Sequence, residues 1–420
     1  MKRALLFALA VAILQSVSAQ VEPFKMRADA FPPIIESLDS KAISMASTIN
    51  EMADWDRYPT YDTYVAMMQD WAQRFPEICQ LDTIGTSVKG RLILCMVIRG
   101  NGDYQNSHPE FFYSSTMHGD EVTGYVMMLR LIDTLLNGYG SNQMYTDLVN
   151  TVDIYINPLS NPDGTYRNGN QTVSGATRYN ANFVDLNRNY PDPFGTEPMN
   201  AQQKENTAMI NYVSNHNFKL SANLHGGAEV MNYPWDSFTT SEQPHPDREW
   251  WIGVCKRFVD TSRTYSNNHF RDTYNSGYTA GGDWYVIPNG RQDYINYYHN
   301  CREMTMEISS DKTISSTQLP EYWRFLQHSL VNYITEIHTF NSPVAIEDTH
   351  NEPSIRLYPN PTNDKVFLQG ETDGDIFIFN IQGKEVMHLP AETRLIDLLS
   401  LPSGIYLLRT GTQTSKIVKR

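Results

Sequence analysis

His118 and Glu121 stand three residues apart in a short loop between two apolar segments. The segment before the loop, Phe111 to Tyr113, is aromatic and predicts a buried strand. The segment after it, Val122 to Leu136, has apolar residues at helical spacing. In an open sheet of alternating strands and helices, ligands collect where strands end. A histidine and a carboxylate at this spacing can bind one metal ion from the same side, although His-x-x-Glu alone recurs by chance and is a weak signal.

A third ligand is available at the end of another predicted strand. Leu220 to Leu224, which is expected to form a strand, leads directly into His225, which two glycines follow. Two histidines and one glutamate, with water in the fourth position, form a catalytic zinc set. The sequence therefore predicts one zinc ion per chain, bound by His118, Glu121 and His225.

Other polar residues accompany these ligands in places where they need an explanation. The long loop after the predicted strand Val152–Ile156 carries Arg178 and Arg188, whose guanidinium groups suit a carboxylate. The alternative is a solvated loop. Glu307 lies inside the apolar strand Met304–Ile308, where a carboxylate needs a partner or a raised pKa, and either suits a general base. The alternative for Glu307 is an edge strand that faces water.

Composition narrows the class of protein. A chain of 420 residues with 40% hydrophobic residues suits one large domain with a sizeable core and a smaller second domain. A net charge of -14 argues against nucleic acid or an anionic membrane as partner and weakly favours cationic ligands, although solubility alone explains it equally well. The four cysteines form no C-x-x-C pair, and Cys95 and Cys301 lie in strand-like segments. We therefore predict no disulfide.

The N-terminus has the pattern of a targeting signal. Lys2 and Arg3 precede an apolar run from Ala4 to Leu14, and small residues follow up to Ala19. This pattern predicts a secretory signal peptide that is removed after Ala19. The run is too short for a transmembrane helix, and no other run approaches the necessary length.

The remaining segments divide the chain into two domains. Strands and helices alternate from residue 55 to residue 340, which predicts an α/β domain, an α/β/α sandwich with a mixed, mostly parallel central sheet. Residues 20–54 are polar and predict a linker or a short pro-segment, and residues 341–354 predict a second linker. Residues 355–420 contain only short strands separated by turns, which predicts a small all-β sandwich. Besides the segments already named, helices are expected at Val65–Phe75, Ala201–His216, Trp250–Tyr265 and Tyr322–His338, and a strand is expected at Leu92–Ile98.

Together, the motifs between Trp55 and His338 resemble the zinc metallocarboxypeptidase family, that of carboxypeptidases A and B. They resemble its carboxypeptidase N/E/D-like branch most closely, although that branch usually carries a transthyretin-like β domain directly after the catalytic domain. The resemblance implies a peptide hydrolase that removes C-terminal residues. It implies that zinc is bound by His118, Glu121 and His225, and that Asp185 orients His118. It implies that Glu307 is the general base and acid and that Arg178 stabilises the oxyanion. It also implies that the substrate carboxylate is bound by Asn187, Arg188 and Tyr285.

The same resemblance gives Asp236 a role in specificity. In the N/E/D-like branch, the acid that follows Tyr-Pro-aromatic lies at the floor of the pocket for the last side chain. Asp236 follows Tyr233-Pro234-Trp235, so the resemblance implies a preference for C-terminal Lys or Arg. Gln292 occupies the position that decides specificity in the A/B branch, and it is neutral. The alternative for Asp236 is a turn carboxylate that caps the following loop.

Two other functions fit the same sequence. One is a murein-peptide carboxypeptidase that uses the same metal site on cell-wall stems. The other is a non-catalytic peptide-binding protein, whose signature would be the loss of Glu307 or of a zinc ligand, and neither is lost.

The C-terminal segment resembles a type IX secretion sorting domain. The resemblance rests on Leu357–Pro361, Ile381–Val386, Leu401–Tyr406 and the basic end Lys416–Arg420. It implies a Gram-negative source and export across the outer membrane by the type IX secretion machinery, with a secreted or cell-surface product. The alternative is a generic β-sandwich binding module.

Overall fold

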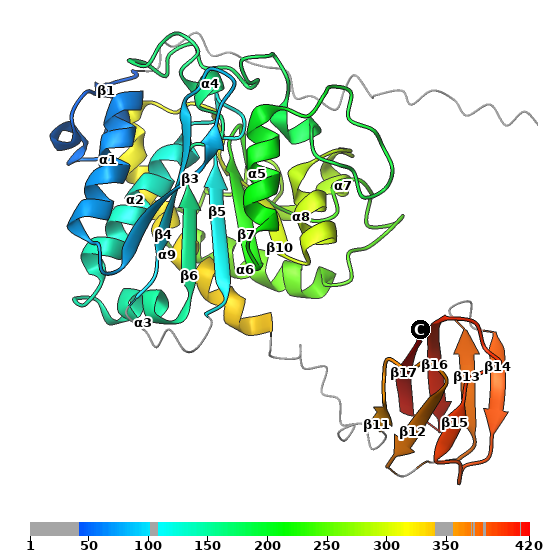
Figure 1. Ribbon diagram of the computed structural model, residues 1–420. Coiled ribbons are helices and arrows are strands. Elements are labelled where there is room, and N and C mark those ends of the chain that lie inside the picture. Colours follow the sequence, from blue (N-terminus) through cyan, green and yellow to red (C-terminus); the bar gives the residue numbers. More distant parts are fainter. Residues whose placement is uncertain are drawn as a thin grey trace, which may run out of the picture. The chain divides into compact units, whose positions relative to one another are not determined.

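The computed structural model describes residues 42–100, 108–340, 356–370, 372, 374–380, 384–411 and 413–420. The chain divides into two compact units, and the boundary follows Phe340. The larger unit is coloured blue to yellow in Figure 1, and the smaller one orange to red. The predicted signal peptide, cut after Ala19, and the predicted linker at 341–354 lie outside the described residues.

An eight-stranded mixed sheet forms the centre of the larger unit, with strand order β3-β4-β6-β5-β7-β10-β8-β9. The central strands β6, β5, β7 and β10 run parallel, whereas β4 and β8 pair antiparallel with β6 and β10. The strands are β3 Cys79–Thr86, β4 Leu92–Ile98, β5 Glu110–Ser115, β6 Asp153–Asn157, β7 Phe218–His225, β8 Ala228–Tyr233, β9 Tyr278–Ala280 and β10 Arg302–Ser309.

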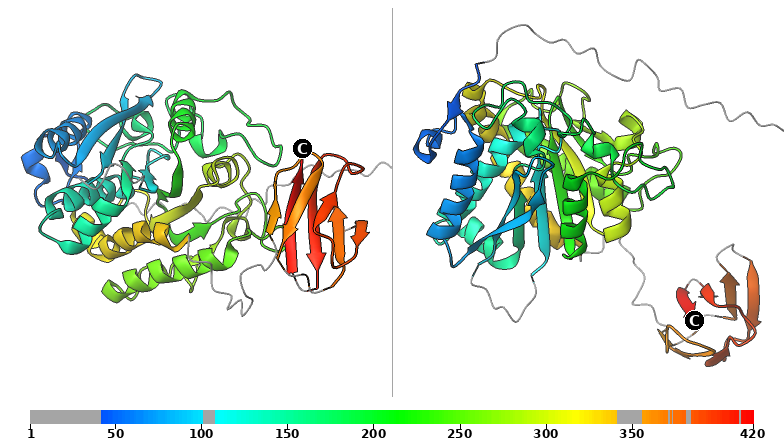
Figure 2. Two further views of the ribbon diagram at one scale, coloured as in Figure 1. Left: turned by 60° about the horizontal axis from the view of Figure 1, so that its bottom comes forward. Right: turned by 45° about the horizontal axis from the view of Figure 1, so that its top comes forward.

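Helices cover both faces of this sheet (Figures 1 and 2). Side chains alternate between the faces of a strand, so Phe111 and Tyr113 of β5 enter one apolar cluster while Phe112 enters the other. Helices α1, α2, α6 and α9 contribute to the first cluster, and α5 and α8 to the second. The predicted α/β/α sandwich is confirmed. The helices are α1 Tyr61–Arg74, α2 Thr123–Gly138, α3 Gln143–Thr151, α4 Pro162–Thr165, α5 Lys204–Ser214, α6 Arg248–Tyr265, α7 Gly281–Trp284, α8 Arg291–His299 and α9 Leu319–Thr335.

Part of the segment expected to be an N-terminal linker is folded onto the larger unit. Strand β1 (Met45–Ala46) pairs with β2 (Tyr58–Pro59), and between them lies the 3-10 helix η1 (Ile49–Met52). Ala46 and Met52 are buried in the core. Elements of two to four residues are too short to show a hydrophobic period, which explains why the sequence pattern does not reveal them.

The smaller unit consists of two antiparallel sheets around one apolar cluster. Buried and exposed residues alternate along β12 and β16, the pattern expected of strands with one buried face. The all-β prediction is confirmed. One sheet contains β11 Arg356–Tyr358, β12 Lys365–Gln369 and β15 Leu395–Asp397, and the other contains β13 Ile376–Asn380, β14 Glu385–Leu389, β16 Gly404–Thr410 and β17 Gln413–Lys419.

Two further predictions concern cysteines and membrane spans. All four cysteines, including Cys95 and Cys301, are buried and free. Within the described ranges, every helix is too short or too polar to cross a membrane.

Candidate metal centre and adjoining pocket

Three predicted metal ligands meet at the carboxyl ends of two neighbouring strands. His118 and Glu121 lie in the loop after β5, and His225 is the last residue of β7. The two strands are parallel, and their register places the end of β5 beside Leu224. All three side chains are buried, and one ligand atom from each lies within 4.8 Å of the others.

Neighbouring side chains orient both histidines toward one point. The two Nδ1 atoms lie 3.0 Å apart, and the Glu121 carboxylate lies 3.0 Å from Nδ1 of His118 and 2.8 Å from Nδ1 of His225. On the far side of each ring, Nε2 of His118 is 3.2 Å from the Asp185 carboxylate, and Nε2 of His225 contacts the Asn223 amide at 2.6 Å. Such outer partners fix the ring orientation of metal-binding histidines.

The protonation states of this cluster suit a metal ion. Burial lowers the pKa of His225 to about 4, so its imidazole is neutral at pH 7. Burial alone would raise the pKa of Glu121, but the two histidines outweigh it and hold the pKa well below its usual range. Neutral imidazole and ionised carboxylate are the metal-binding forms. Two histidines and one glutamate therefore fit a catalytic zinc ion.

Two glycines allow the loop of His118 to pack closely against the loop that carries Arg178. A side chain at Gly119 would come within 2.4 Å of the Gly164 backbone, and one at Gly164 would come within 2.6 Å of the Tyr179 carbonyl. Asn161 joins the loops because its side-chain nitrogen donates to the carbonyls of Met117 and Arg178. The segment Asn161–Gly164, with the sequence Asn-Pro-Asp-Gly, therefore has a structural role beside the candidate metal centre.

Arg178 and Asp185 form an ion pair at the edge of the ligand cluster. Nε of Arg178 donates to Asp185 at 2.8 Å, and its Nη1 lies 3.1 Å from Nδ1 of His118 and 3.6 Å from Glu121. Burial would raise the pKa of Asp185, but His118 and Arg178 hold it far below its usual range. The cluster therefore contains an ionised carboxylate and a cation fixed next to the candidate metal position.

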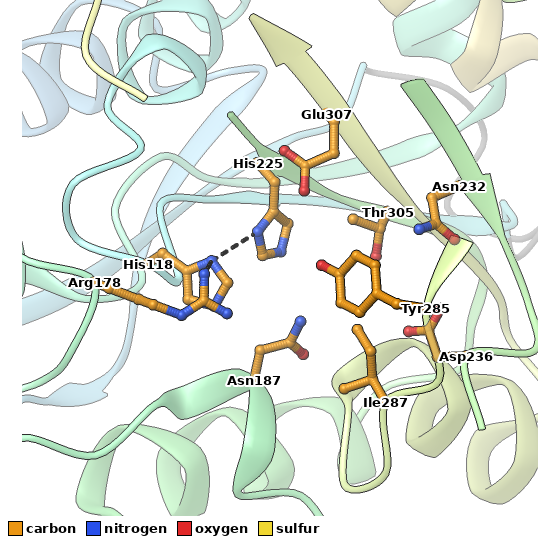
Figure 3. A pocket seen from close by; sticks show the side chains of 10 residues that line it. All are labelled: His118, Arg178, Asn187, His225, Asn232, Asp236, Tyr285, Ile287, Thr305 and Glu307. Carbon is orange, nitrogen blue, oxygen red and sulfur yellow. Dashed lines mark hydrogen bonds between the residues drawn. The ribbon is translucent and has the colours of Figure 1, made fainter. Parts of the chain in front are cut away.

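A pocket adjoins the ligands (Figure 3). Seven of its lining residues were among the predicted site residues, whereas Asn232, Ile287 and Thr305 were not. Thr305 lies two residues before Glu307 on β10 and pairs with Asn232 of β8, so strand alternation could have identified it. Ile287 has no such signal. The lining residues are His118, Arg178, Asn187, His225, Asn232, Asp236, Tyr285, Ile287, Thr305 and Glu307.

Glu307 enters the pocket from β10, opposite His225 in the strand register. Figure 3 shows its carboxylate on the same side of the pocket as the His225 ring. Burial raises the pKa of Glu307 well above its usual range, and the charge of Glu121 raises it further. Its Oε2 atom is buried and has no hydrogen-bond partner in the described part of the chain. This oxygen can accept a proton.

Asn187, Arg188 and Tyr285 supply hydrogen-bond donors near the opposite wall. The Asn187 oxygen accepts from the backbone N–H of Arg291 at 2.9 Å, which leaves its amide N–H groups available to the pocket. Arg188 is half-buried and donates to the Asn187 carbonyl at 2.8 Å. The Tyr285 hydroxyl points into the pocket (Figure 3), and burial raises its pKa, so it stays a neutral donor.

Asp236 reaches the pocket from the loop after β8 and is 2% exposed. Its Oδ1 atom accepts from the Gln292 amide at 2.7 Å, while the Gln292 oxygen accepts from the Thr305 backbone at 2.6 Å. Burial raises the pKa of Asp236 well above its usual range. The structure thus brings a buried carboxylate and the predicted specificity position, Gln292, into direct contact.

Residues 64–328 match the family described as zinc carboxypeptidase, and residues 356–420 match the secretion system C-terminal sorting domain. Carboxypeptidase D from Mus musculus is 34% identical over 284 residues, which cover 64% of this chain and 20% of that protein. The catalytic chain of carboxypeptidase N from Rattus norvegicus is 31% identical over 340 residues, 70% of this chain and 72% of that protein. The chain therefore spans about a fifth of the length of the carboxypeptidase D relatives.

Solved structures show the same fold. Carboxypeptidase A from Helicoverpa armigera aligns with a TM-score of 0.58 at 18% identity and covers 69% of this chain and 75% of that one. Thrombin activatable fibrinolysis inhibitor aligns with a TM-score of 0.58 at 17% identity, over 67% of this chain and 75% of that one.

Proposed function

Because the chain belongs to the zinc carboxypeptidase family, we propose that it is a secreted, zinc-dependent enzyme that hydrolyses the C-terminal residue of peptides and proteins, with a preference for Lys and Arg. The observation that supports this best is the convergence on one pocket of a buried two-histidine, one-glutamate ligand set and a buried glutamate with a free oxygen.

The roles proposed for the side chains follow from their positions. His118, Glu121 and His225 would hold a zinc ion, which would supply the Lewis acidity that makes water a nucleophile at neutral pH. Glu307 accepts a proton on its Oε2 atom from the attacking water, whose oxygen bonds to the scissile carbonyl carbon, and returns the proton to the amine that leaves when the C–N bond breaks. Arg178 donates to the scissile carbonyl oxygen as negative charge develops there.

An exopeptidase also needs donors that recognise a free carboxylate at a fixed distance from the reacting bond. Asn187 and Tyr285 can meet this need because both line the pocket. Arg188 is not among the lining residues, but it donates to the backbone carbonyl of Asn187, which is. A guanidinium and an amide together satisfy both oxygens of a carboxylate. The substrate is therefore held by its terminus, and the last side chain points toward Asp236.

Asp236 sets the proposed preference for basic residues. A buried carboxylate pairs strongly with a cationic side chain, whereas an apolar side chain leaves it unpaired. We expect kcat/KM for peptides that end in Lys or Arg to be at least about tenfold higher than for peptides that end in Leu or Phe. This ratio corresponds to about 1.4 kcal/mol of transition-state stabilisation.

A panel of peptides that differ only in their last residue (Lys, Arg, Leu or Phe) tests this function, with and without a metal chelator. The chelator should abolish hydrolysis of every peptide. Asp236→Ala should remove most of the basic preference while the zinc content stays the same. Equal or faster hydrolysis of the Phe peptide by the unaltered enzyme would overturn the proposed specificity, and full activity in chelator would overturn the proposed chemistry.

The match of residues 356–420 to a sorting domain indicates secretion across the outer membrane or to the cell surface. We propose the type IX secretion machinery as the partner that handles this domain.

A further inference from the structure

Behind the pocket floor lies a second carboxylate, that of Asp293 in the first turn of α8. Its two oxygens accept from two consecutive backbone N–H groups, that of Asp236 at 2.8 Å and that of Ser237 at 2.9 Å. Asp293 is 1% exposed and Asp236 is 2% exposed. One buried carboxylate therefore fixes the backbone of the residue that carries the other.

The residue next to Asp293 holds the side chain of Asp236. The Gln292 amide nitrogen donates to Oδ1 of Asp236, and its oxygen accepts from the Thr305 backbone on β10. Among the described residues, no hydrogen bond engages Oδ2 of Asp236. The first turn of α8 thus fixes both the backbone and one oxygen of Asp236, and leaves the other oxygen for a ligand.

We propose that Asp293 is the positioning residue of the basic pocket: it holds Asp236 in place, and its charge makes binding of a cationic side chain expel a proton from the carboxylate pair. This inference rests on the proposed function, because the cation is the last side chain of the substrate.

Burial and the surrounding charges favour a proton on this carboxylate pair. Burial raises the pKa of Asp236 well above its usual range and that of Asp293 to about 6, and each is raised further by neighbouring carboxylates. The charges of Asp293 and Glu303 raise the pKa of Asp236, and the charge of Asp192 raises the pKa of Asp293. The positive charge of Arg188 lowers the pKa of Asp236. The positive charge of Arg291 is balanced by Glu303, whose carboxylate lies 2.9 Å away. Two buried carboxylates with this balance bind a proton more tightly than exposed carboxylates do.

A cationic side chain stabilises the second negative charge, so its binding releases the proton. Protonation competes with the cation, and the affinity for a basic terminus therefore rises with pH until the pair is fully ionised. The ratio of kcat/KM for Arg-terminated over Leu-terminated peptides should rise by up to about tenfold per pH unit, as one released proton requires. Arg is the better probe because its guanidinium stays charged throughout.

The experiment measures this ratio between pH 5 and pH 9 for the full-length enzyme and for Asp293→Asn. The asparagine oxygen can still accept from Asp236, but the negative charge and the bond from Ser237 are lost. The ratio should reach a lower plateau, and its midpoint should move to lower pH because Asp236 ionises more easily without its neighbour. A merely structural role would lower the ratio at every pH and leave the midpoint in place, which would overturn the proposal.

Two comparisons complete the test. Asp283→Asn removes the same charge from an exposed aspartate that also binds a backbone N–H, that of Thr240, and should follow the wild-type curve. Asp236→Asn should lose the Arg preference, and adding Asp293→Asn should then change nothing further. If Asp236→Asn keeps the preference, the proposed specificity fails. If Asp236→Asn loses it while Asp293→Asn follows the wild-type curve, only this inference fails.

Discussion

Glu307 carries the proton in the proposed reaction, and its surroundings explain how a glutamate can do so near neutral pH. It lies between Met306 and Ile308, both fully buried, on a strand inside the sheet. Burial and the charge of Glu121 raise its pKa well above the usual range, toward the value that a general base needs. An exposed glutamate at the same distance from the metal would be a weaker base.

Replacing Glu307 with glutamine tests this role. The substitution keeps the size of the side chain and removes its ability to take a proton, so zinc content should be unchanged while kcat falls by about two to four orders of magnitude. Metal analysis and steady-state kinetics on the same preparation measure the two quantities. Near-normal kcat would show that another group takes the proton.

Residue types and spacing predicted that His118, Glu121 and His225 would lie close together, because each follows the end of a predicted strand. The structure brings these three side chains together. Asp293 could not be found in this way, because an acid in the first turn of a helix is an ordinary feature. Only the contacts of Asp293 with Asp236 and Ser237, more than fifty residues earlier in the chain, distinguish it.

At the scale of elements, the central strands were predictable because apolar residues recur along short segments that alternate with helical ones. β8 and α8 were not, although both line or support the pocket. β8 carries Glu229 and Asn232, and the buried residues of α8 include Arg291, Gln292 and Asp293. Polar residues occupy some of their buried positions and interrupt the hydrophobic period in the sequence. Elements that build a polar pocket are the ones that this kind of pattern misses.

Glu229 shows the energetic consequence of such a polar position on β8. Its carboxylate accepts from the Phe270 backbone at 2.9 Å, and burial raises its pKa to about 7. The folded protein therefore keeps a proton that the unfolded chain releases near pH 4 to 5. Stability from this group is lost as pH rises between about 5 and 7. Nearby His269, with a pKa lowered by burial to about 4, stays neutral throughout.

Glu229→Gln should remove this pH dependence. We expect the variant to melt a few degrees higher than the wild type at pH 8 but not at pH 5, as measured by calorimetry at both pH values. Glu242→Gln is the matched control, because Glu242 is exposed and its pKa is lowered, so it is ionised at both pH values in either state. If the melting temperatures of Glu229→Gln and the wild type differed by the same amount at pH 5 and pH 8, a raised pKa for Glu229 would be ruled out.

At the scale of the whole molecule, the chain combines two units with separate apolar cores. The change from alternating strands and helices to short strands alone predicted this division. The sequence did not predict that residues 42–54 fold with the larger unit. Tertiary packing of Ala46 and Met52, rather than any local period, orders that segment.

Deleting residues 355–420 should separate catalysis from export. The candidate metal ligands and the pocket residues all lie in the larger unit, so the truncated protein should bind zinc as the full-length protein does and keep its kcat/KM on Arg-terminated peptides. In its own host it should accumulate in the periplasm, because the sorting domain that directs the last export step is missing.

The matched control is an unrelated periplasmic reporter fused to residues 341–420, which should reach the cell surface or the medium. Fractionation of the host cells, with activity and antibody detection in each fraction, measures both chains. Normal surface delivery of the truncated enzyme would show that the export signal lies in the larger unit, and loss of zinc from it would show that the two units depend on each other for folding.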